Sequence, residues 1–334
     1  MTTPTARIAL VGANGHGMHH RMQLEEFEAG ELVALCDRAE VEEPPDGVPV
    51  FTDHAEMLAT VKPEVVIVST PPATHLQIAA DALRAGADVL LEKPPVLNLQ
   101  EHEALSQVES ATGRAVQVGF QALMSLELPR LKALAPCDVA IFGSWQRDDD
   151  YWTRSPWAGR LPLDGALRNP FAHAVMQALA VAGSEPVRVE VAWCRIRDIE
   201  VEDTATLRLT LANGKRVLIA VTLAGEDFID SRMIVGGQTE LDYRVDSGLP
   251  LLENLLAHRR DGEPLLAPLE LTRGFTAVVQ ALGGMPRPGL APSEEGVLVG
   301  VNAALERCAR ELALLSEIDI PWAATVTGGT ATIG

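Results

Sequence analysis

The chain has 334 residues, 27 of them basic and 46 acidic, which gives a formal net charge of −19. Binders of nucleic acid or anionic membranes need a broad basic surface, so this balance argues against both classes. With 47% hydrophobic residues the chain can form a sizeable core, and its length suggests two domains.

The N-terminal residues 1–6 are polar and lack the apolar core of a secretory signal. No apolar run approaches the roughly 20 residues needed to cross a bilayer. The cysteines are far apart and form no CxxC pair, which indicates reduced thiols rather than disulfides or a zinc site: Cys36, Cys137, Cys194 and Cys308. We therefore expect a cytoplasmic protein.

The first third of the chain alternates short apolar runs with helical patterns. The runs are typical of strands buried on both faces, and they span residues 7–11, 32–36, 65–68, 89–91 and 116–118. Three predicted helices open on a capping side chain with a polar residue three positions later, at Asp53–Glu56, Thr74–Gln77 and Asn98–Glu101. This alternation predicts a doubly wound α/β domain with a parallel sheet over residues 1–122.

After Phe120 apolar and polar residues alternate, over residues 187–193, 207–211, 217–223 and 239–243. The alternation predicts an antiparallel sheet with one wetter face. Asn213-Gly214 predicts a type I′ hairpin turn, which requires positive φ at both residues. Apolar residues three and four apart over 298–315 predict a helix docked on the sheet. Residues 123–334 are thus predicted as an α+β domain on an open, mainly antiparallel sheet, whose exposed face is a candidate oligomer surface.

The first predicted strand runs into a glycine-rich loop. Gly12 and Gly17 occupy the first and third positions of a GxGxxG pattern, and Asn14 stands at the second, followed by Gly15 and His16. Glycines let the backbone approach a pyrophosphate, and the next helix points its free N–H groups at that anion. Asparagine tolerates left-handed φ better than most residues. The loop therefore predicts a dinucleotide site on a Rossmann domain.

Asp37 ends the second predicted strand 25 residues after Gly12. An acidic side chain there accepts hydrogen bonds from the adenosine ribose, and its charge disfavours a 2′-phosphate. Two roles are open for Arg38 beside it, because its side chain can hold that phosphate or stack on adenine. The pair favours NAD as the cofactor and leaves NADP open.

Two further segments follow the loop, VVIVSTPPATH at residues 65–75 and AGADVLLEKP at residues 85–94. This combination resembles the Gfo/Idh/MocA oxidoreductases, the family of glucose-fructose oxidoreductase and inositol dehydrogenase. The resemblance is clearest over residues 7–122 and weaker beyond. It implies cofactor contacts from Ser69, Thr70, Pro71, His75, Glu92, Lys93 and Gln121. The resemblance also implies that Lys93 lies between nicotinamide and substrate, where a lysine can exchange a proton with a hydroxyl.

Many members of that family carry an aspartate four residues before a proton-transferring histidine in the second domain. Here His173 matches the histidine and Asn169 takes the position of the acid. Asparagine can orient a hydroxyl but cannot transfer a proton. A hydrogen-bonded structural histidine is the other reading of His173.

Aromatic residues interleave with arginines in the segment Tyr151–Arg160, which includes Arg154 and Trp157. Flat rings and guanidinium groups suit a sugar or an acid sugar, and a loop pinned by its tryptophans is an equal alternative. The acidic run at residues 148–150 lacks a ligand pattern, so we predict no metal.

The combined hypothesis is an NAD(P)-dependent oxidoreductase that moves a hydride between nicotinamide and a sugar, polyol or sugar-derived acid. Lys93 and His173 would handle the hydroxyl proton, while Asn169, Arg154 and Arg160 would orient the substrate. Two alternatives stay open, NAD-assisted glycoside cleavage and a cofactor-binding sensor without activity. The resemblance implies a homo-oligomer, a dimer or tetramer.

Overall fold

The computed structural model describes residues 5–237, 239–242 and 250–333, and it divides the chain into two compact units. The first unit holds residues 5–121 and the described residues of 247–276. The second unit holds the described residues of 122–246 together with 277–333. The chain therefore leaves the first unit near the boundary predicted at residue 122, and it returns to that unit before the second is complete.

The first unit is built on a six-stranded sheet with the order β3-β2-β1-β4-β5-β6, in which every pairing is parallel. Its strands are β1 (Ala6–Val11), β2 (Gly30–Cys36), β3 (Val50–Phe51), β4 (Val65–Val68), β5 (Asp88–Leu91) and β6 (Val116–Val118). The helices of this part are α1 (His16–Glu25), α2 (His54–Val61), α3 (His75–Arg84) and α4 (Leu99–Thr112). The predicted Rossmann topology is confirmed, with β3 as an additional short strand.

Two of the three predicted helix caps form. The side chains of Asp53 and Asn98 accept the N–H groups of Glu56 and Glu101, each at 2.9 Å. Thr74 does not cap α3, because its hydroxyl donates to the Thr70 hydroxyl and the Pro71 carbonyl. The capping box predicted there is therefore wrong: a short 3-10 turn over Pro72–Thr74 leads into the helix instead.

A late segment completes the first unit. The helix α8 (Pro250–Asp261) packs against β5, and the Gln117 side chain in β6 binds the segment on both sides. Its amide donates to the Leu251 carbonyl at 3.1 Å, and its oxygen accepts the Ala267 N–H at 2.9 Å. Arg259 adds an ion pair to Asp88 at 2.6 Å. The sequence-based division placed this segment in the second domain because the residues of β5 and β6 that it contacts lie more than 100 positions earlier.

The second unit is built on a mixed sheet with the order β12-β11-β7-β10-β9-β8-β13, and β14 also pairs with β8. Among the strand pairs that the structure describes in this sheet, β7–β10 and β8–β13 are parallel and the others are antiparallel. The strands are β7 (Val139–Gln146), β8 (Pro186–Arg195), β9 (Thr204–Leu211), β10 (Arg216–Thr222), β11 (Ala224–Val235), β12 (Thr239–Asp242), β13 (Gly289–Leu290) and β14 (Thr327–Thr332). The mainly antiparallel sheet is confirmed. Tyr243, predicted at the end of one strand, lies outside the described residues.

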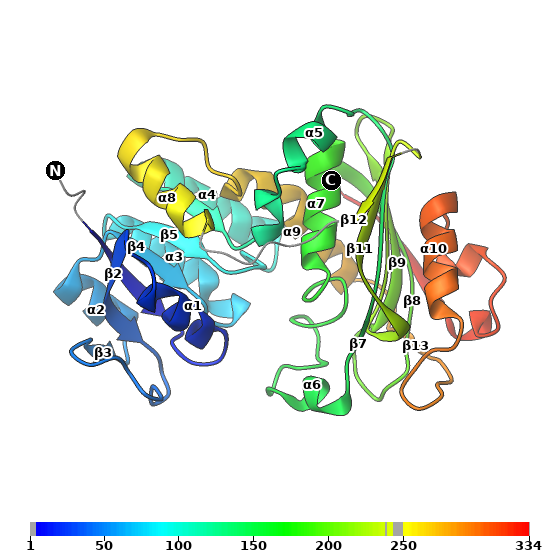
Figure 1. The fold of residues 1–334 in the computed structure, drawn as a ribbon, viewed down its shortest axis with the longest axis horizontal. Helices are drawn as coiled ribbons and strands as arrows, with labels where there is room; N and C mark the ends of the chain where they lie inside the picture. Colours follow the sequence, from blue (N-terminus) through cyan, green and yellow to red (C-terminus); the bar gives the residue numbers. More distant parts are fainter. Residues whose placement is uncertain (1–4, 238, 243–249, 334) are drawn as a thin grey trace. The chain divides into compact units, whose positions relative to one another are not determined.

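Helices pack on both faces of this sheet, with α7 (Ala172–Ala182) on one side and α10 (Val301–Glu311) on the other (Figure 1). Val301, Leu305 and Cys308 of α10 join a buried cluster with alternate residues of the strands, such as Phe142 and Leu218. The predicted docked helix therefore exists. The described strands β7 and β10 are buried almost throughout, so the centre of the sheet lacks the exposed face that we expected as an oligomer surface.

The Asn213-Gly214 connection differs from the predicted turn. Gly214 has a φ of 79°, whereas Asn213 is not among the described residues with positive φ. The Leu211 N–H donates to the Lys215 carbonyl, and the Asn213 side chain accepts the Lys215 N–H at 3.0 Å. One positive φ excludes a type I′ turn, and β9 and β10 are joined by a wider loop that the Asn213 side chain closes.

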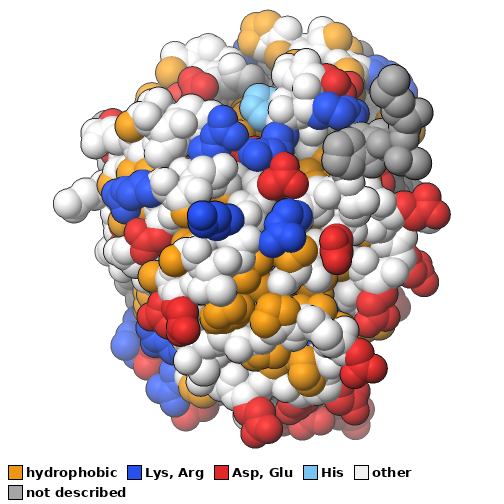
Figure 2. Space-filling view, turned by 90° about the vertical axis from the view of Figure 1, so that its left-hand side faces the viewer, with side chains coloured by type: hydrophobic (Ala, Val, Ile, Leu, Met, Phe, Trp, Pro, Cys, Tyr) orange, Lys and Arg blue, Asp and Glu red, His pale blue; other side chains and the backbone are white. Residues whose placement is uncertain are grey.

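The remaining helices are α5 (Leu128–Lys132), α6 (Asp149–Thr153) and α9 (Arg273–Gly283), and α9 carries the chain from the first unit into the second. In the described part of the chain, no helix is both long and apolar enough to span a membrane. All four cysteines are free thiols, and three of them are buried. On the face shown in Figure 2, basic and acidic side chains intermingle around a group of hydrophobic ones.

Candidate functional site

The loop after β1 depends on its glycines. Gly12 has a φ of 86°, and a Cβ atom there would lie 2.6 Å from the Ser69 carbonyl oxygen. A Cβ atom on Gly17 would lie 1.8 Å from the Gly12 oxygen. Gly15 has a φ of 55° and immediately precedes α1, with open space around it. The strained positions are thus glycines, and Asn14 does not take the left-handed φ that its type tolerates.

Asp37 lies against this loop. Its carboxylate accepts the Asn14 N–H at 3.1 Å and the Ala39 N–H at 3.0 Å. The Asn14 amide in turn donates to the Glu40 carbonyl, which ties the loop to the chain after β2. Arg38 is exposed beside Asp37. The sequence-predicted glycine loop and acidic residue are therefore neighbours in the structure.

These residues fit a dinucleotide. The N-terminus of α1 follows Gly15 directly, so the positive end of the helix dipole lies at the loop, where it favours an anion such as a pyrophosphate. The Ser69 hydroxyl beside Gly12 is buried and has no hydrogen-bond partner among the described residues. A buried hydroxyl normally finds a partner, and a bound cofactor can supply one.

His75 lies in the interior between the Thr70 and Pro94 segments. Its Nε2 lies 2.8 Å from the Thr70 carbonyl oxygen, and its Nδ1 lies 3.0 Å from that of Pro94. Burial lowers the pKa of His75 although both carbonyls favour the charged form. A neutral imidazole donates from one nitrogen only. The neutral ring therefore donates to one of these two carbonyls and contacts the other, and it lies between the segments that carry Thr70 and Pro94.

Glu92 and Lys93 follow β5, next to β4 in the sheet. Glu92 is buried, and its Oε2 accepts the Lys93 N–H at 3.2 Å. Lys93 and Gln121 are half-buried. The Glu92 carboxylate thus holds the backbone that carries the predicted proton-transfer lysine.

The other oxygen of Glu92 faces two histidines of α1. Its Oε1 lies 3.0 Å from His20 Nε2 and 3.5 Å from His16 Nε2. Burial opposes ionisation of Glu92, but these two rings outweigh it and hold the pKa of Glu92 well below its ordinary value. The hydrogen bond between His16 and Glu92 also raises the pKa of His16. The sequence analysis missed His20, although its spacing of four from His16 on a predicted helix indicates a shared face.

In the second unit, a buried acid stands beside the asparagine that replaced the expected aspartate. Asp164 accepts the Asn169 amide at 3.0 Å and the Gly159 N–H at 2.8 Å. Arg154 completes the cluster with contacts of 3.2 Å to both carboxylate oxygens. Asp164 precedes Asn169 by five residues, a spacing that suggests no shared helix face, so sequence reasoning did not single it out.

Side chains of the predicted aromatic segment contact one another. The Arg154 guanidinium lies 3.7 Å from the centre of the Tyr151 ring and 4.9 Å from that of Trp157. Burial raises the pKa of Tyr151 to about 12, so this phenol stays protonated near neutral pH. Arg160 is exposed. Arg154 is therefore held between two rings and an acid, while Arg160 points to solvent.

His173 is the second residue of α7 and is half-buried. The helix begins at Ala172, so Asn169 lies in the turn before it and not on a common helical face with His173. A second buried acid supports this turn: Glu202 accepts the Leu167 N–H and pairs with Arg168 at 3.1 Å. The histidine is thus presented by a helix N-terminus, while Asn169 is placed by Asp164.

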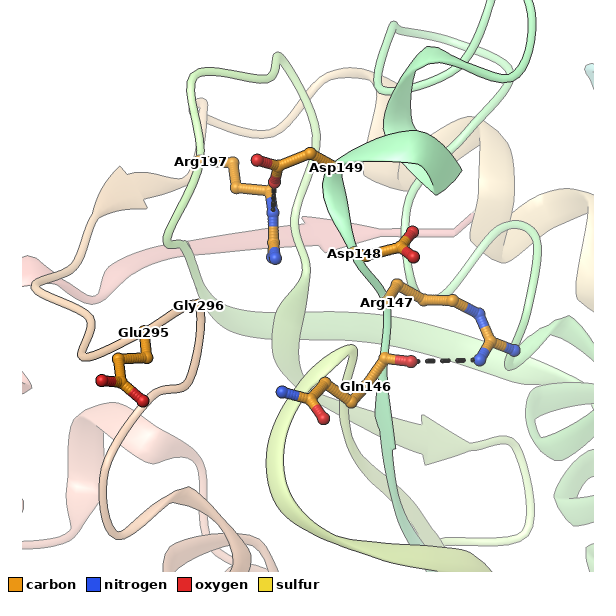
Figure 3. A pocket seen from close by; sticks show the side chains of 7 residues that line it. All are labelled: Gln146, Arg147, Asp148, Asp149, Arg197, Glu295 and Gly296. Carbon is orange, nitrogen blue, oxygen red and sulfur yellow. Dashed lines mark hydrogen bonds and ion pairs between the residues drawn. The ribbon is translucent and has the colours of Figure 1, made fainter.

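A cavity of about 430 Å³ lies beside the N-terminus of α6, where the aromatic segment begins (Figure 3). Its lining comes from the end of β7 and from two loops, and consists of Gln146, Arg147, Asp148, Asp149, Arg197, Glu295 and Gly296. Asp148 caps α6, and Asp149 pairs with Arg197 at 2.8 Å. The acidic run therefore serves a helix cap and an ion pair, and this polar cavity is distinct from the pocket predicted around Trp157.

Two family profiles match the chain. Residues 6–120 match the oxidoreductase family with an NAD-binding Rossmann fold, and residues 138–239 match the GFO/IDH/MocA C-terminal domain. A glycosyl hydrolase family 109 protein from Akkermansia muciniphila is 29% identical over 37% of this chain and 30% of its own length. An inositol 2-dehydrogenase from Agrobacterium fabrum is 34% identical over 35% of this chain and 37% of its own. These matches span less than half of either relative.

The solved structures extend the likeness to both units. The WlbA dehydrogenase from Bordetella pertussis, in complex with NADH and UDP-GlcNAcA, has a TM-score of 0.69 and 20% identity. The match covers 83% of this chain and 95% of that one, and it establishes the common fold. The first unit is an NAD-binding Rossmann domain. The chain belongs to the GFO/IDH/MocA family of oxidoreductases.

Proposed function

We propose that the protein is an NAD(P)-dependent oxidoreductase that acts on a CH–OH group of a sugar, polyol or sugar-derived acid. The observation that carries this proposal is the placement of Lys93, at the carboxyl end of a strand two places from β1 and its glycine loop. In open parallel sheets, ligands bind at this edge. When bound, the nicotinamide supplies or accepts the hydride.

Lys93 is proposed to exchange the proton of the substrate hydroxyl. Its backbone is anchored by Glu92, and Glu92 is itself fixed by burial and by His20. A proton-transfer group must be held in place to act within hydrogen-bond reach, and this anchoring supports that role. His173, at the start of α7, is proposed as the second group at the same hydroxyl.

Asn169 and Arg154, which are proposed to orient the substrate, belong to one cluster around Asp164. Asp164 holds Asn169 and Arg154 by direct contacts, and Tyr151 and Trp157 enclose the guanidinium. A preorganised cluster of this kind presents amide and ring surfaces without further ordering cost. Arg160 is exposed and is proposed to contact a carboxylate or hydroxyl group of the substrate.

The test is a nicotinamide-absorbance screen of wild type and Lys93→Ala over a panel of polyols and aldoses. Because a positioned proton-transfer group contributes about 10²- to 10⁴-fold, we expect wild-type turnover on at least one compound and a loss of that size in the variant. Lys62→Ala, an exposed lysine on the same unit, is the matched control. Equal rates for wild type and Lys93→Ala would contradict the role of Lys93.

The same screen separates the alternatives. Product formation from a glycoside without net absorbance change would indicate NAD-assisted cleavage. NADH binding without turnover of any compound would indicate a sensor. Either result would replace the proposed reaction while leaving the NAD-binding domain in place.

A further inference from the structure

Two histidines and a carboxylate converge beside the cofactor loop. His16 and His20 lie one turn apart on α1, and Glu92 follows β5. Their nearest ligand atoms all lie within 4.8 Å of one another, and in the described residues this is the one group of three such side chains. The prediction of no metal considered residues close in sequence, whereas 72 positions separate His20 from Glu92.

The two separations between Glu92 and the histidines are close to those of a metal's ligands. Two ligands at about 2.1 Å from a tetrahedral zinc ion lie about 3.4 Å apart. The Glu92 oxygen is 3.0 Å from His20 Nε2 and 3.5 Å from His16 Nε2. The i, i+4 spacing on one helix holds both imidazoles on the same side. A small movement of His16 would bring all three atoms into a coordination shell.

The surroundings give the group a rigid base and an open side. Glu92 and His20 are buried, and Glu92 Oε2 accepts the Lys93 N–H, which orients the carboxylate. A Cβ atom on Gly119 would lie 2.9 Å from that oxygen, so the backbone packs closely behind it. The His16 side chain is 58% exposed. Metal ions can therefore reach the group from solvent, and a fourth position remains for water.

The ligand chemistry selects the class of metal. Two imidazoles and one carboxylate suit Zn²⁺, Ni²⁺ or Cu²⁺, whereas Mg²⁺ and Ca²⁺ prefer oxygen ligands. The positive end of α1 and the neighbouring Lys93 disfavour cations that are held by charge alone. We propose that His16, His20 and Glu92 form a binding site for one divalent transition metal of the zinc class.

The test is titration calorimetry of the full chain, without an affinity tag, with ZnCl₂ and separately with MgCl₂. We expect one zinc-class site, at least roughly tenfold weaker binding in His16→Ala, and no binding of Mg²⁺. His19→Ala is the matched control, because His19 is the exposed neighbour on α1 and its ring stacks on His16 outside the group. The control should bind Zn²⁺ as wild type does.

Co²⁺ provides a second readout that does not depend on affinity alone. Nitrogen and oxygen ligands in a tetrahedral site give bound Co²⁺ an intense visible spectrum, which we expect in wild type and His19→Ala and not in His16→Ala. Thermal melts without metal check that each variant is folded. Equal Zn²⁺ affinity in wild type and His16→Ala, or the same Co²⁺ spectrum in both, would overturn the site.

Discussion

The Asp37 carboxylate combines two tasks in one side chain. It accepts the N–H groups of Asn14 and Ala39, so it shapes the loop, and it places a negative charge beside that loop. Its neighbour Arg38 is exposed and carries the opposite charge. We propose that the balance between these two residues decides whether a 2′-phosphate is tolerated.

We expect Asp37→Asn to reduce the preference for NADH over NADPH by roughly tenfold, because the amide keeps the shape and removes the repulsion of a phosphate. Fluorescence titration of both reduced cofactors measures the ratio of dissociation constants. Arg38→Ala is the companion variant and should leave NADH affinity within about threefold. If the ratio is unchanged in Asp37→Asn but shifts in Arg38→Ala, Arg38 is the selecting residue.

The glycine loop, Asp37 and the Glu92-Lys93 pair could be proposed as site residues from sequence because each lies within a short motif. Asp164 could not, and the only signal for His20 was its spacing of four from His16, since the importance of both residues comes from partners in the fold. His20 meets Glu92 across the β1–β4–β5 part of the sheet, and Asp164 meets Asn169 through a turn with no regular period. Side-chain clusters that form across elements leave no periodic signal in one sequence.

At the scale of elements, α4 has the cap that α3 lacks. Asn98 accepts the Glu101 N–H, and the Glu101 carboxylate accepts the Leu97 N–H at 2.9 Å. The Thr74 hydroxyl instead binds the turn that precedes α3. The stability of α4 therefore depends on one side chain outside the helix.

Asn98→Ala should lower the free energy of unfolding by about 1 kcal/mol, because the Glu101 N–H loses its acceptor. Urea unfolding followed by circular dichroism measures the change. Gln107→Ala, an exposed change in the middle of the same helix, should stay within about 0.5 kcal/mol of wild type. An Asn98→Ala variant as stable as this control would show that the cap contributes nothing measurable.

Five strands of the first sheet and four of the second could be predicted, because buried runs and alternating runs have distinct patterns. The strands β7, β11, β13 and β14 were not predicted. Three further features escaped. The strand β3 has only two residues, and α8 belongs to the first unit through contacts such as that of Gln117 with Leu251. The β9–β10 loop was assigned to the wrong turn type, since the Asn213 side chain closes a longer connection. In each case distant or side-chain contacts outweigh the local preference.

At the scale of the whole molecule, the folded state contains acidic side chains whose pKa values shift in opposite directions. Partners lower the pKa of Glu190 and Glu317, which face Arg208. Burial raises the pKa of Asp203 to about 6, although it accepts the Ile196 N–H at 2.8 Å. The contribution of Glu190 and Glu317 to stability is lost as the pH falls, whereas the contribution of Asp203 is lost as the pH rises.

Asp203 should make stability fall between pH 5 and pH 7.5. Its folded pKa lies above the unfolded value, so its contribution is complete below about pH 4 and is lost as the pH rises through 6. We expect the stability of wild type relative to Asp203→Asn to decrease by about 1–2 kcal/mol over that interval. Thermal melts of both proteins across the range provide the measurement, and parallel pH profiles would contradict this assignment.

The return of residues 250–276 to the first unit has a consequence for synthesis on the ribosome. The α8 helix and Ala267 cover β5 and β6. The chain leaves the first unit at residue 121, and the segment that completes the unit ends at residue 276, 155 residues later. At a translation rate of about 5–20 residues per second, the parallel sheet of the nascent chain remains without this segment for up to about 8–30 s. During that interval the strands β7 to β12 are synthesised, so the domain that starts first is completed only after most of the second domain has been made.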